Sequence, residues 1–284
     1  MLLSRVGSHT KTAGGLAKAA LPYADAAASE AIQVYVSNSR GWALPPGDPA
    51  QDVLFRDGCE TRAIPSYVHA SLLVNLGSPT PLTVTRSVET LEHALRRGRD
   101  IGATAVVYHA GSSVDPEHDS KAMHQLREAL LPVLDRAAAT GLPKLLVEPS
   151  AGGGRSLASK VHDLGPYLAA AEDHPWLGVC FDTCHAWAAG HDLATPGGMT
   201  ATLDALIATV GPQRLQLIHA NDSKDECGST RDRHETIGAG RIGAAPFAEL
   251  FAHPAVAGVP VIVETPSEAH LGHAADIALL KSLR

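Results

Sequence analysis

The 284-residue chain lacks several features that mark particular classes of protein. It has only four cysteines without tight pairing, which excludes a disulfide-stabilised scaffold. No apolar run approaches the roughly 20 residues that a membrane helix needs. The first residues have too short an apolar stretch for a signal peptide and no small-residue cleavage site. We therefore expect a soluble cytoplasmic protein in a reducing compartment, with no membrane partner.

Positive charge is also scarce, with 23 Lys and Arg against 30 Asp and Glu and a formal net charge of −7. This balance alone argues against a nucleic-acid binder, which usually has a basic surface, unless bound cations change the sum. The chain is rich in histidine, with 15 residues. Histidine favours metal binding and acid–base chemistry. With 45% hydrophobic and 19% charged residues the chain is not disordered.

Eight short apolar runs rich in Val, Ile and Leu recur along the chain, as expected of buried parallel strands. They are 2–6, 31–36, 67–69, 105–109, 144–148, 178–182, 215–219 and 260–264.

Helix-like stretches lie between these runs. The stretches 126–137, 203–210 and, more weakly, 88–95 repeat apolar residues at i, i+3, i+4 and i+7. Eight strands alternating with helices predict an α/β protein, a TIM (β/α)₈ barrel that forms a single domain over residues 1–284. The alternative is an open doubly wound sheet, but no Gly-x-Gly-x-x-Gly follows the first strand as dinucleotide binding would require.

Six consecutive runs end in a histidine or a carboxylate, which predicts a metal site. In a parallel barrel the carboxyl ends of all strands meet at one rim, where active sites lie. Burying several carboxylates together without cations would be costly. Imidazole nitrogen and carboxylate oxygen suit zinc, and also manganese or ferrous iron. The six candidates are His69, His109, Glu148, Asp182, His219 and Glu264.

Two further segments add candidate ligands. His185 stands just past the end of the sixth run. Asp232 and His234 are two residues apart in a polar loop after the seventh run, so both side chains leave an extended segment on one side. Loops at this place in a barrel often carry catalytic or phosphate-binding groups. Cys180 and Cys184 have no second pair, and we expect them to pack beside the site.

These motifs together resemble the endonuclease IV family of abasic-site DNA endonucleases. The resemblance covers nearly the whole chain, from Gly7 to Thr265. The motifs that carry it are CFDTCHA at 180–186, HANDS at 219–223, DRHE at 232–235 and IGAG at 237–240.

The resemblance implies a TIM barrel with three zinc ions, although manganese or iron would suit some positions. All nine implied ligand positions hold the expected residue type. Three zinc ions would raise the formal net charge from −7 to about −1, so the rim that faces DNA would be positive. The implied ligand sets for the three ions are His69, His109 and Glu148; Glu148, Asp182, His219 and Glu264; and His185, Asp232 and His234.

The activity implied is hydrolysis of the phosphodiester 5′ to an abasic site in double-stranded DNA, leaving a 3′-hydroxyl and a 5′-deoxyribose phosphate. Such a base excision repair enzyme would use a water activated by zinc, which lowers the pKa of bound water to about 7. Glu264 and the bridging Glu148 are the candidate catalytic residues, and Glu264 would orient the nucleophile. We expect a monomer that needs no separate general base.

Recognition of a missing base requires residues that wedge into the gap in the duplex. The family pattern points to Arg40 and to the pair Leu72 and Leu73. Many relatives carry Tyr at the position of Leu72, and some carry Gln at that of Gly153, so DNA recognition can differ from theirs. The expected DNA contacts are Arg40, Leu72, Leu73, His9, Asn221 and Arg233.

Two other functions remain open at this point. A sugar isomerase or epimerase on the same kind of barrel would hold one divalent metal with four ligands, but the five remaining candidates would then have no purpose. A non-catalytic damage-binding protein would keep zinc for stability alone. The four residues that could serve a single metal are Glu148, Asp182, His219 and Glu264.

Overall fold

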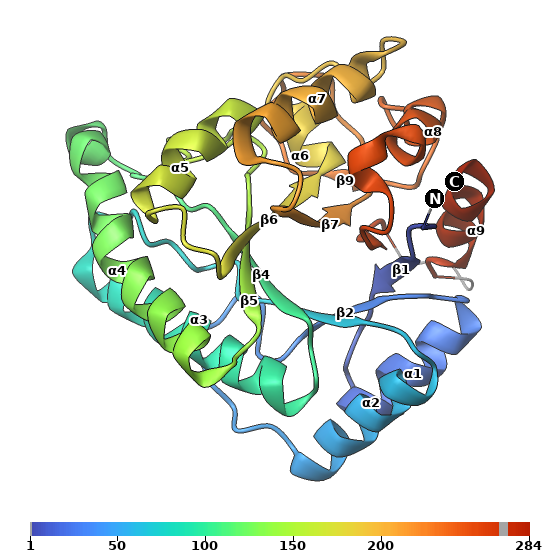
Figure 1. The fold of residues 1–284 in the computed structure, drawn as a ribbon, viewed down its shortest axis with the longest axis horizontal. Helices are drawn as coiled ribbons and strands as arrows, with labels where there is room; N and C mark the ends of the chain where they lie inside the picture. The colour runs from blue at the N-terminus through green and yellow to red at the C-terminus, as the bar shows by residue number, and fades with distance from the viewer. Residues whose placement is uncertain (1, 267–271) are drawn as a thin grey trace.

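Eight parallel strands form a closed barrel in the computed structural model, which describes residues 2–266 and 272–284 (Figure 1). Around the barrel the strands lie in the order β1-β10-β7-β6-β5-β4-β3-β2, and β2 pairs with β1 to close it. This confirms the predicted (β/α)₈ barrel. The strands are β1 Val6–His9, β2 Ile32–Tyr35, β3 Ser66–His69, β4 Ala105–His109, β5 Lys144–Glu148, β6 Leu177–Asp182, β7 Leu215–His219 and β10 Val261–Val263.

Helices surround the barrel in Figure 1 and cover the outer face of its strands. The three predicted amphipathic stretches lie within α3, α4 and α7. None of the described helices is both long and apolar enough to cross a membrane. The α-helices are α1 Leu16–Ala26, α2 Pro49–Thr61, α3 Pro81–Asp100, α4 Asp119–Thr140, α5 Leu164–Ala170, α6 Thr183–Ala188, α7 Gly198–Val210, α8 Ala245–Ala252 and α9 Ala274–Leu283, and the 3₁₀ turns are η1 Pro116–His118, η2 Val161–Asp163 and η3 Pro254–Val256.

The first predicted strand, 2–6, is wrong. Leu2 and Leu3 are 81% and 65% exposed, so this apolar run is not part of the core. The strand begins at Val6 and continues to His9. The polar loop after β7 also contains a short antiparallel pair, β8 Asp222–Ser223 with β9 His234–Glu235, that the sequence did not predict.

The interior of the barrel determines which residues reach the rim. A buried apolar cluster fills it, separate from the larger cluster between the strands and the helices. Successive side chains of a strand alternate between its two faces, so the residue two positions after an interior residue points into the barrel again, nearer the carboxyl end. The interior cluster consists of Ala31, Tyr67, Ala105, Val107, Leu146, Cys180, Leu217 and Ile262. The residues two positions later at the rim are Gln33, His69, His109, Glu148, Asp182, His219 and Glu264.

Candidate metal centre

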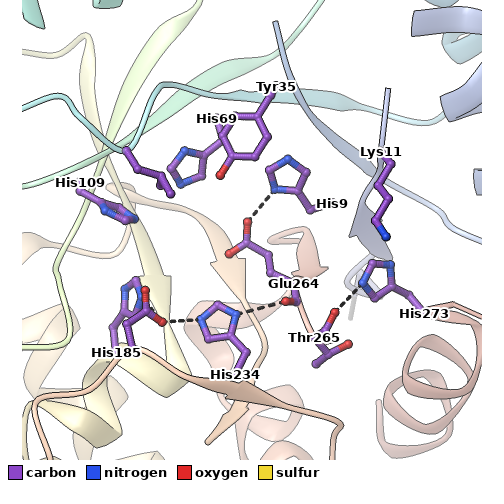
Figure 2. Close-up of a pocket in the computed structure, with 12 residues that line it drawn as sticks. His9, Lys11, Tyr35, His69, His109, His185, His234, Glu264, Thr265 and His273 are labelled. Carbon is purple, nitrogen blue, oxygen red and sulfur yellow. Dashed lines mark hydrogen bonds and ion pairs between the residues drawn. The ribbon is translucent and has the colours of Figure 1, made fainter. Parts of the chain in front are cut away.

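The nine candidate ligands come together at the carboxyl end of the barrel. Six of them line one pocket (Figure 2), and the other three, Glu148, Asp182 and His219, are buried. Six stand at or directly after strand ends, and the other three come from α6 and from the loop that contains β9. They form three groups, in each of which the candidate ligand atoms lie within 4.8 Å of one another. The groups are His69, His109 and Glu148; Glu148, Asp182, His219 and Glu264; and His185, Asp232 and His234.

Glu148 joins two of the groups because its two oxygens face different histidines. Its Oε2 atom lies 3.3 Å from Nε2 of His69 and 3.5 Å from Nε2 of His109. Its Oε1 atom lies 3.0 Å from Nδ1 of His219 and 3.3 Å from Nδ1 of His185. The side chain is fully buried. This is the geometry of a bridging carboxylate.

The third group is centred on Asp232. Its Oδ1 atom lies 3.3 Å from Nε2 of His185 and 3.0 Å from Nε2 of His234. Asp182 connects this group to the second, because its Oδ2 atom is 3.8 Å from Nε2 of His234 and 3.9 Å from Nδ1 of His219. The two-residue spacing of Asp232 and His234 therefore brings both side chains to one place.

Four of the histidines are oriented by a hydrogen bond from one ring nitrogen to a carbonyl oxygen. A carbonyl oxygen only accepts, so that nitrogen carries a proton and the other nitrogen is the one that would bind a metal. The bonds are His69 Nδ1–H to Ala70 O at 2.8 Å, His185 Nδ1–H to Pro149 O at 3.0 Å, His234 Nδ1–H to Glu264 O at 3.2 Å, and His219 Nε2–H to Gln33 Oε1 at 2.9 Å.

The donor set fits zinc. The Nε2 atoms of His185 and His234 are buried and have no hydrogen-bond partner within the described residues. Buried polar atoms without partners are costly, and a cation beside Asp232 would satisfy both. Imidazole nitrogens combined with carboxylate oxygens are ligands that zinc takes readily.

Burial and neighbouring charges set the protonation of the site. Burial lowers the pKa of His109 to about 4, so this imidazole is neutral and ready to bind a metal. Burial also acts to lower the pKa of His234, but the nearby carboxylates of Asp232 and Asp182 outweigh it and raise that pKa to about 9. Burial raises the pKa of Cys180 to about 12, so its thiol stays protonated and packs in the barrel interior.

The expected DNA contacts lie mostly at the rim. Leu72 lines the pocket and is 37% exposed, whereas Leu73 is half-buried. Arg40 is exposed in a turn after β2. This turn is held close to Leu72, whose N–H donates to the Ser39 carbonyl at 2.8 Å. The rim after β2 and β3 is therefore one connected surface beside the pocket.

Two of the expected contacts, Asn221 and Arg233, are already engaged within the protein. Asn221 has no exposed surface, so it is not available to DNA in this structure. Its Nδ2 donates to Oδ2 of Asp182 at 2.7 Å, and its Oδ1 accepts the N–H of Glu264 at 2.8 Å. Asn221 thus holds two candidate ligands in place. Arg233 is exposed and pairs with Asp225, with Nε 2.7 Å from Oδ2.

His9 lies beside the candidate ligand Glu264. It is the last residue of β1, and its Nδ1 lies 2.7 Å from Oε1 of Glu264. Its ring is tilted against Tyr35, with centroids 4.4 Å apart, and both rings line the pocket.

The sequence analysis missed several residues that shape the site, because it considered only metal-binding types at strand ends. β2 ends in Tyr35, which is not a metal-binding type, so no residue of this strand was predicted to belong to the site. Gln33 on the same strand nevertheless points into the barrel. Asp222 is fully buried, and four N–H groups of the loop 238–243 donate to its carboxylate, at Gly238, Gly240, Ile242 and Gly243. The other pocket-lining residues that were missed are Lys11, Thr265 and His273.

Comparison with known proteins agrees with this geometry. The model of the xylose isomerase-like TIM barrel family matches residues 21–283. A probable endonuclease 4 of Streptomyces avermitilis is 55% identical over 98% of this chain and 90% of its own length. The crystal structure of endonuclease IV from Thermus thermophilus superposes with a TM-score of 0.85 at 33% identity, over 98% of both chains. A D-tagatose 3-epimerase-like protein shares the fold, with a TM-score of 0.70 at 17% identity.

Fold and site together define a xylose isomerase-like TIM barrel with a cluster of imidazole and carboxylate ligands. Within that class the chain belongs to the endonuclease IV family of nucleases.

Proposed function

We propose that the chain is a zinc-dependent DNA repair endonuclease that cuts the phosphodiester 5′ to an abasic site. The observation that carries this proposal is the set of nine candidate ligands in three groups, two of which share Glu148, at one pocket. Membership of the endonuclease IV family supports phosphodiester hydrolysis as the reaction. The products would be a 3′-hydroxyl and a 5′-deoxyribose phosphate.

Bound zinc ions would lower the pKa of water and neutralise charge on the phosphodiester. The side chains would orient the metal ions and the attacking water. The oriented histidines keep their lone pairs directed at the cluster, and Glu148 holds two groups together. Glu264 has one oxygen fixed by His9 and Gln33, while its other oxygen, Oε2, lies 3.2 Å from Nδ1 of His219. This fixed carboxylate would orient the attacking water for in-line displacement.

Substrate selection would take place at the rim. A sugar without a base is cheap to extrude from the duplex, and a narrow pocket excludes a nucleotide that still carries its base. Leu72 and the turn that carries Arg40 are placed to fill the gap left in the stack. Lys11 is the sole Lys or Arg among the described residues that line the pocket, and it suits a phosphate of the DNA backbone.

The single-metal sugar isomerase or epimerase remains the main alternative. Its support is the shared barrel alone, since the epimerase-like protein is only 17% identical. It leaves the group of His185, Asp232 and His234 without a function. A non-catalytic zinc protein that binds damaged DNA would produce a gel shift without nicking.

The proposal is tested with zinc-reconstituted Glu264→Gln protein on a duplex containing one tetrahydrofuran abasic site. We expect nicking to fall by about 100-fold or more, because the amide cannot hold the water as the carboxylate does. Glu117→Gln, at an exposed position of η1, is the matched control and should nick normally. Near-normal cutting by Glu264→Gln would refute the assignment.

A further inference from the structure

Gln33 is a fully buried amide beneath the pocket, on β2, a strand that supplies none of the nine candidate ligands. Its Nε2 donates to Oε1 of Glu264 at 2.7 Å. Its Oε1 accepts the Nε2–H of His219 at 2.9 Å. One side chain therefore connects the candidate nucleophile-orienting carboxylate to an imidazole of the same ligand group.

The chemistry of the amide allows only one arrangement of these bonds. A carboxylate only accepts, so the NH₂ group must face Glu264. The carbonyl oxygen then faces His219 and requires the proton on Nε2 of that ring. The Nδ1 atom of His219 faces the ligand group, 3.0 Å from Oε1 of Glu148 and 3.2 Å from Oε2 of Glu264, and is the atom that would bind a metal. A flipped amide would set two acceptors against each other at Glu264.

The same bonds fix the direction in which Glu264 points. Gln33 and the Nδ1 atom of His9 both lie 2.7 Å from its Oε1 atom. Two partners on one oxygen hold the carboxylate against rotation and leave Oε2 toward the centre of the ligand group. Because Gln33 is completely enclosed, water cannot replace its two bonds without a change in the core.

We propose that Gln33 is a positioning residue that holds the Nε2–H of His219 and the orientation of Glu264, and so prepares the second ligand group for its metal. This inference rests on the proposed metal-dependent function of the site. Removal of a residue that hydrogen-bonds to a metal ligand typically lowers metal affinity or activity by 10- to 100-fold. We expect an effect of that size from Gln33.

Gln33→Met tests the proposal, since methionine has a similar shape but neither donor nor acceptor. The first readout is made on metal-free protein, by nitrogen-15 NMR of the imidazole rings. We expect the Nε2–H proton of His219 to be hydrogen-bonded and slow to exchange in the wild type, and to exchange rapidly in Gln33→Met. The second readout is competition for zinc with a chelator, where we expect one ion to be lost about 10- to 100-fold more readily.

A second variant, Gln33→Glu, separates the two bonds. It keeps an acceptor for His219 but sets a carboxylate oxygen against Glu264. We expect the slowly exchanging Nε2–H of His219 to be retained while kcat falls about 10- to 100-fold with little change in KM. Gln33→Glu also keeps the test decisive if Gln33→Met does not fold.

The matched control is Gln216→Met on β7. Gln216 points to the outer side of the barrel, where its Nε2 donates to the Gln213 carbonyl at 3.3 Å. This control should leave the exchange of the His219 Nε2–H, zinc competition and kcat unchanged. The proposal is overturned if Gln33→Met keeps the wild-type Nε2–H exchange and zinc retention, or if Gln216→Met alters them equally. A wild-type protein that does not nick abasic DNA would refute the proposed function, whereas the proton-exchange and zinc readouts would still decide the role of Gln33.

Discussion

The Oε1 atom of Glu148 lies 3.0 Å from the Nδ1 atom of His219, while the other oxygen of the same carboxylate faces His69 and His109. This relationship makes Glu148 the link between two ligand groups. A carboxylate buried without any exposed surface is stable there because imidazoles surround it on both sides. Burial acts to raise the pKa of Glu148, but His219 and His185 outweigh it and hold that pKa well below its usual range.

Replacement of Glu148 should remove two of the three zinc ions and leave one. Glu148→Ala takes a ligand from both groups that share it, whereas His185, Asp232 and His234 retain their own set. We expect the zinc content of the reconstituted protein to fall from three per chain to about one, with loss of nicking. Metal analysis of the purified variant measures this directly. A variant that keeps its full zinc content would show that Glu148 does not bridge.

Lys11 should contribute one phosphate contact to DNA binding. It is exposed at the pocket and makes no ion pair within the parts of the chain that the structure describes. Each neutralised phosphate adds about 0.9 to the slope of log affinity against log salt concentration. We expect Lys11→Ala to reduce that slope by about 0.9 for a tetrahydrofuran duplex. Lys18→Ala, on the exposed side of α1, is the control, and equal slopes for both variants would contradict the assignment.

The side chain at position 72 should control affinity for the gap in the duplex. Leucine fills space but cannot stack as an aromatic ring does, and stacking on a base contributes about 1–3 kcal/mol. We expect Leu72→Tyr to bind abasic duplex about tenfold more tightly than the wild type, and Leu72→Ala to bind more weakly. Equilibrium binding to matched abasic and intact duplexes measures the change. The control is Leu82→Ala, at an exposed leucine on α3, and it should leave the affinity for abasic duplex unchanged.

The C-terminal Arg284 should be joined to Glu30, between α1 and β2, by a pH-dependent ion pair. Burial opposes ionisation of Glu30, but Arg284, the N–H of Val6 and Lys281 outweigh it and lower the pKa of Glu30 from 4.5 to about 2. A carboxyl group with a lowered pKa stabilises the fold above its unfolded value, and this stabilisation is lost as pH falls from 4.5 towards 2.

Glu30→Gln should therefore reduce the free energy of unfolding by about 1 kcal/mol at pH 7, and by less at pH 3. Urea denaturation of the metal-free proteins measures both values without a contribution from metal loss in acid. Glu172→Gln, which removes an exposed pair with Arg127, should change stability by less than about 0.5 kcal/mol. An effect of Glu30→Gln that grows as pH falls would contradict the assignment.

The sequence predicted the barrel and the gathering of its ligands for one physical reason. Strand ends in a parallel barrel share a rim, so a histidine or carboxylate at each end must lie near the others. The structure brings His69, Glu148 and Glu264 together in this way, although they are far apart in the chain. The apolar run 2–6 was wrongly predicted to be a buried strand, because apolar residues also occur on surfaces and burial cannot be read from composition.

The roles of the supporting residues were harder to predict. Gln33 is two residues from a strand end and is not a metal-binding type, so only its distances to Glu264 and His219 reveal its place. Asn221 stands in a motif of the family, but its complete burial depends on contacts between strands that the sequence does not specify. Lys11 follows β1 and reaches the pocket through the path of its loop.

Titration of zinc into metal-free protein, with nicking of a tetrahydrofuran duplex recorded at each step, tests the central claim most directly. If the nine ligands hold three ions that act together, nicking reaches its plateau only at about three equivalents of zinc per chain. A titration that saturates at about one equivalent, with the duplex left intact, would contradict the account and favour a single-metal enzyme.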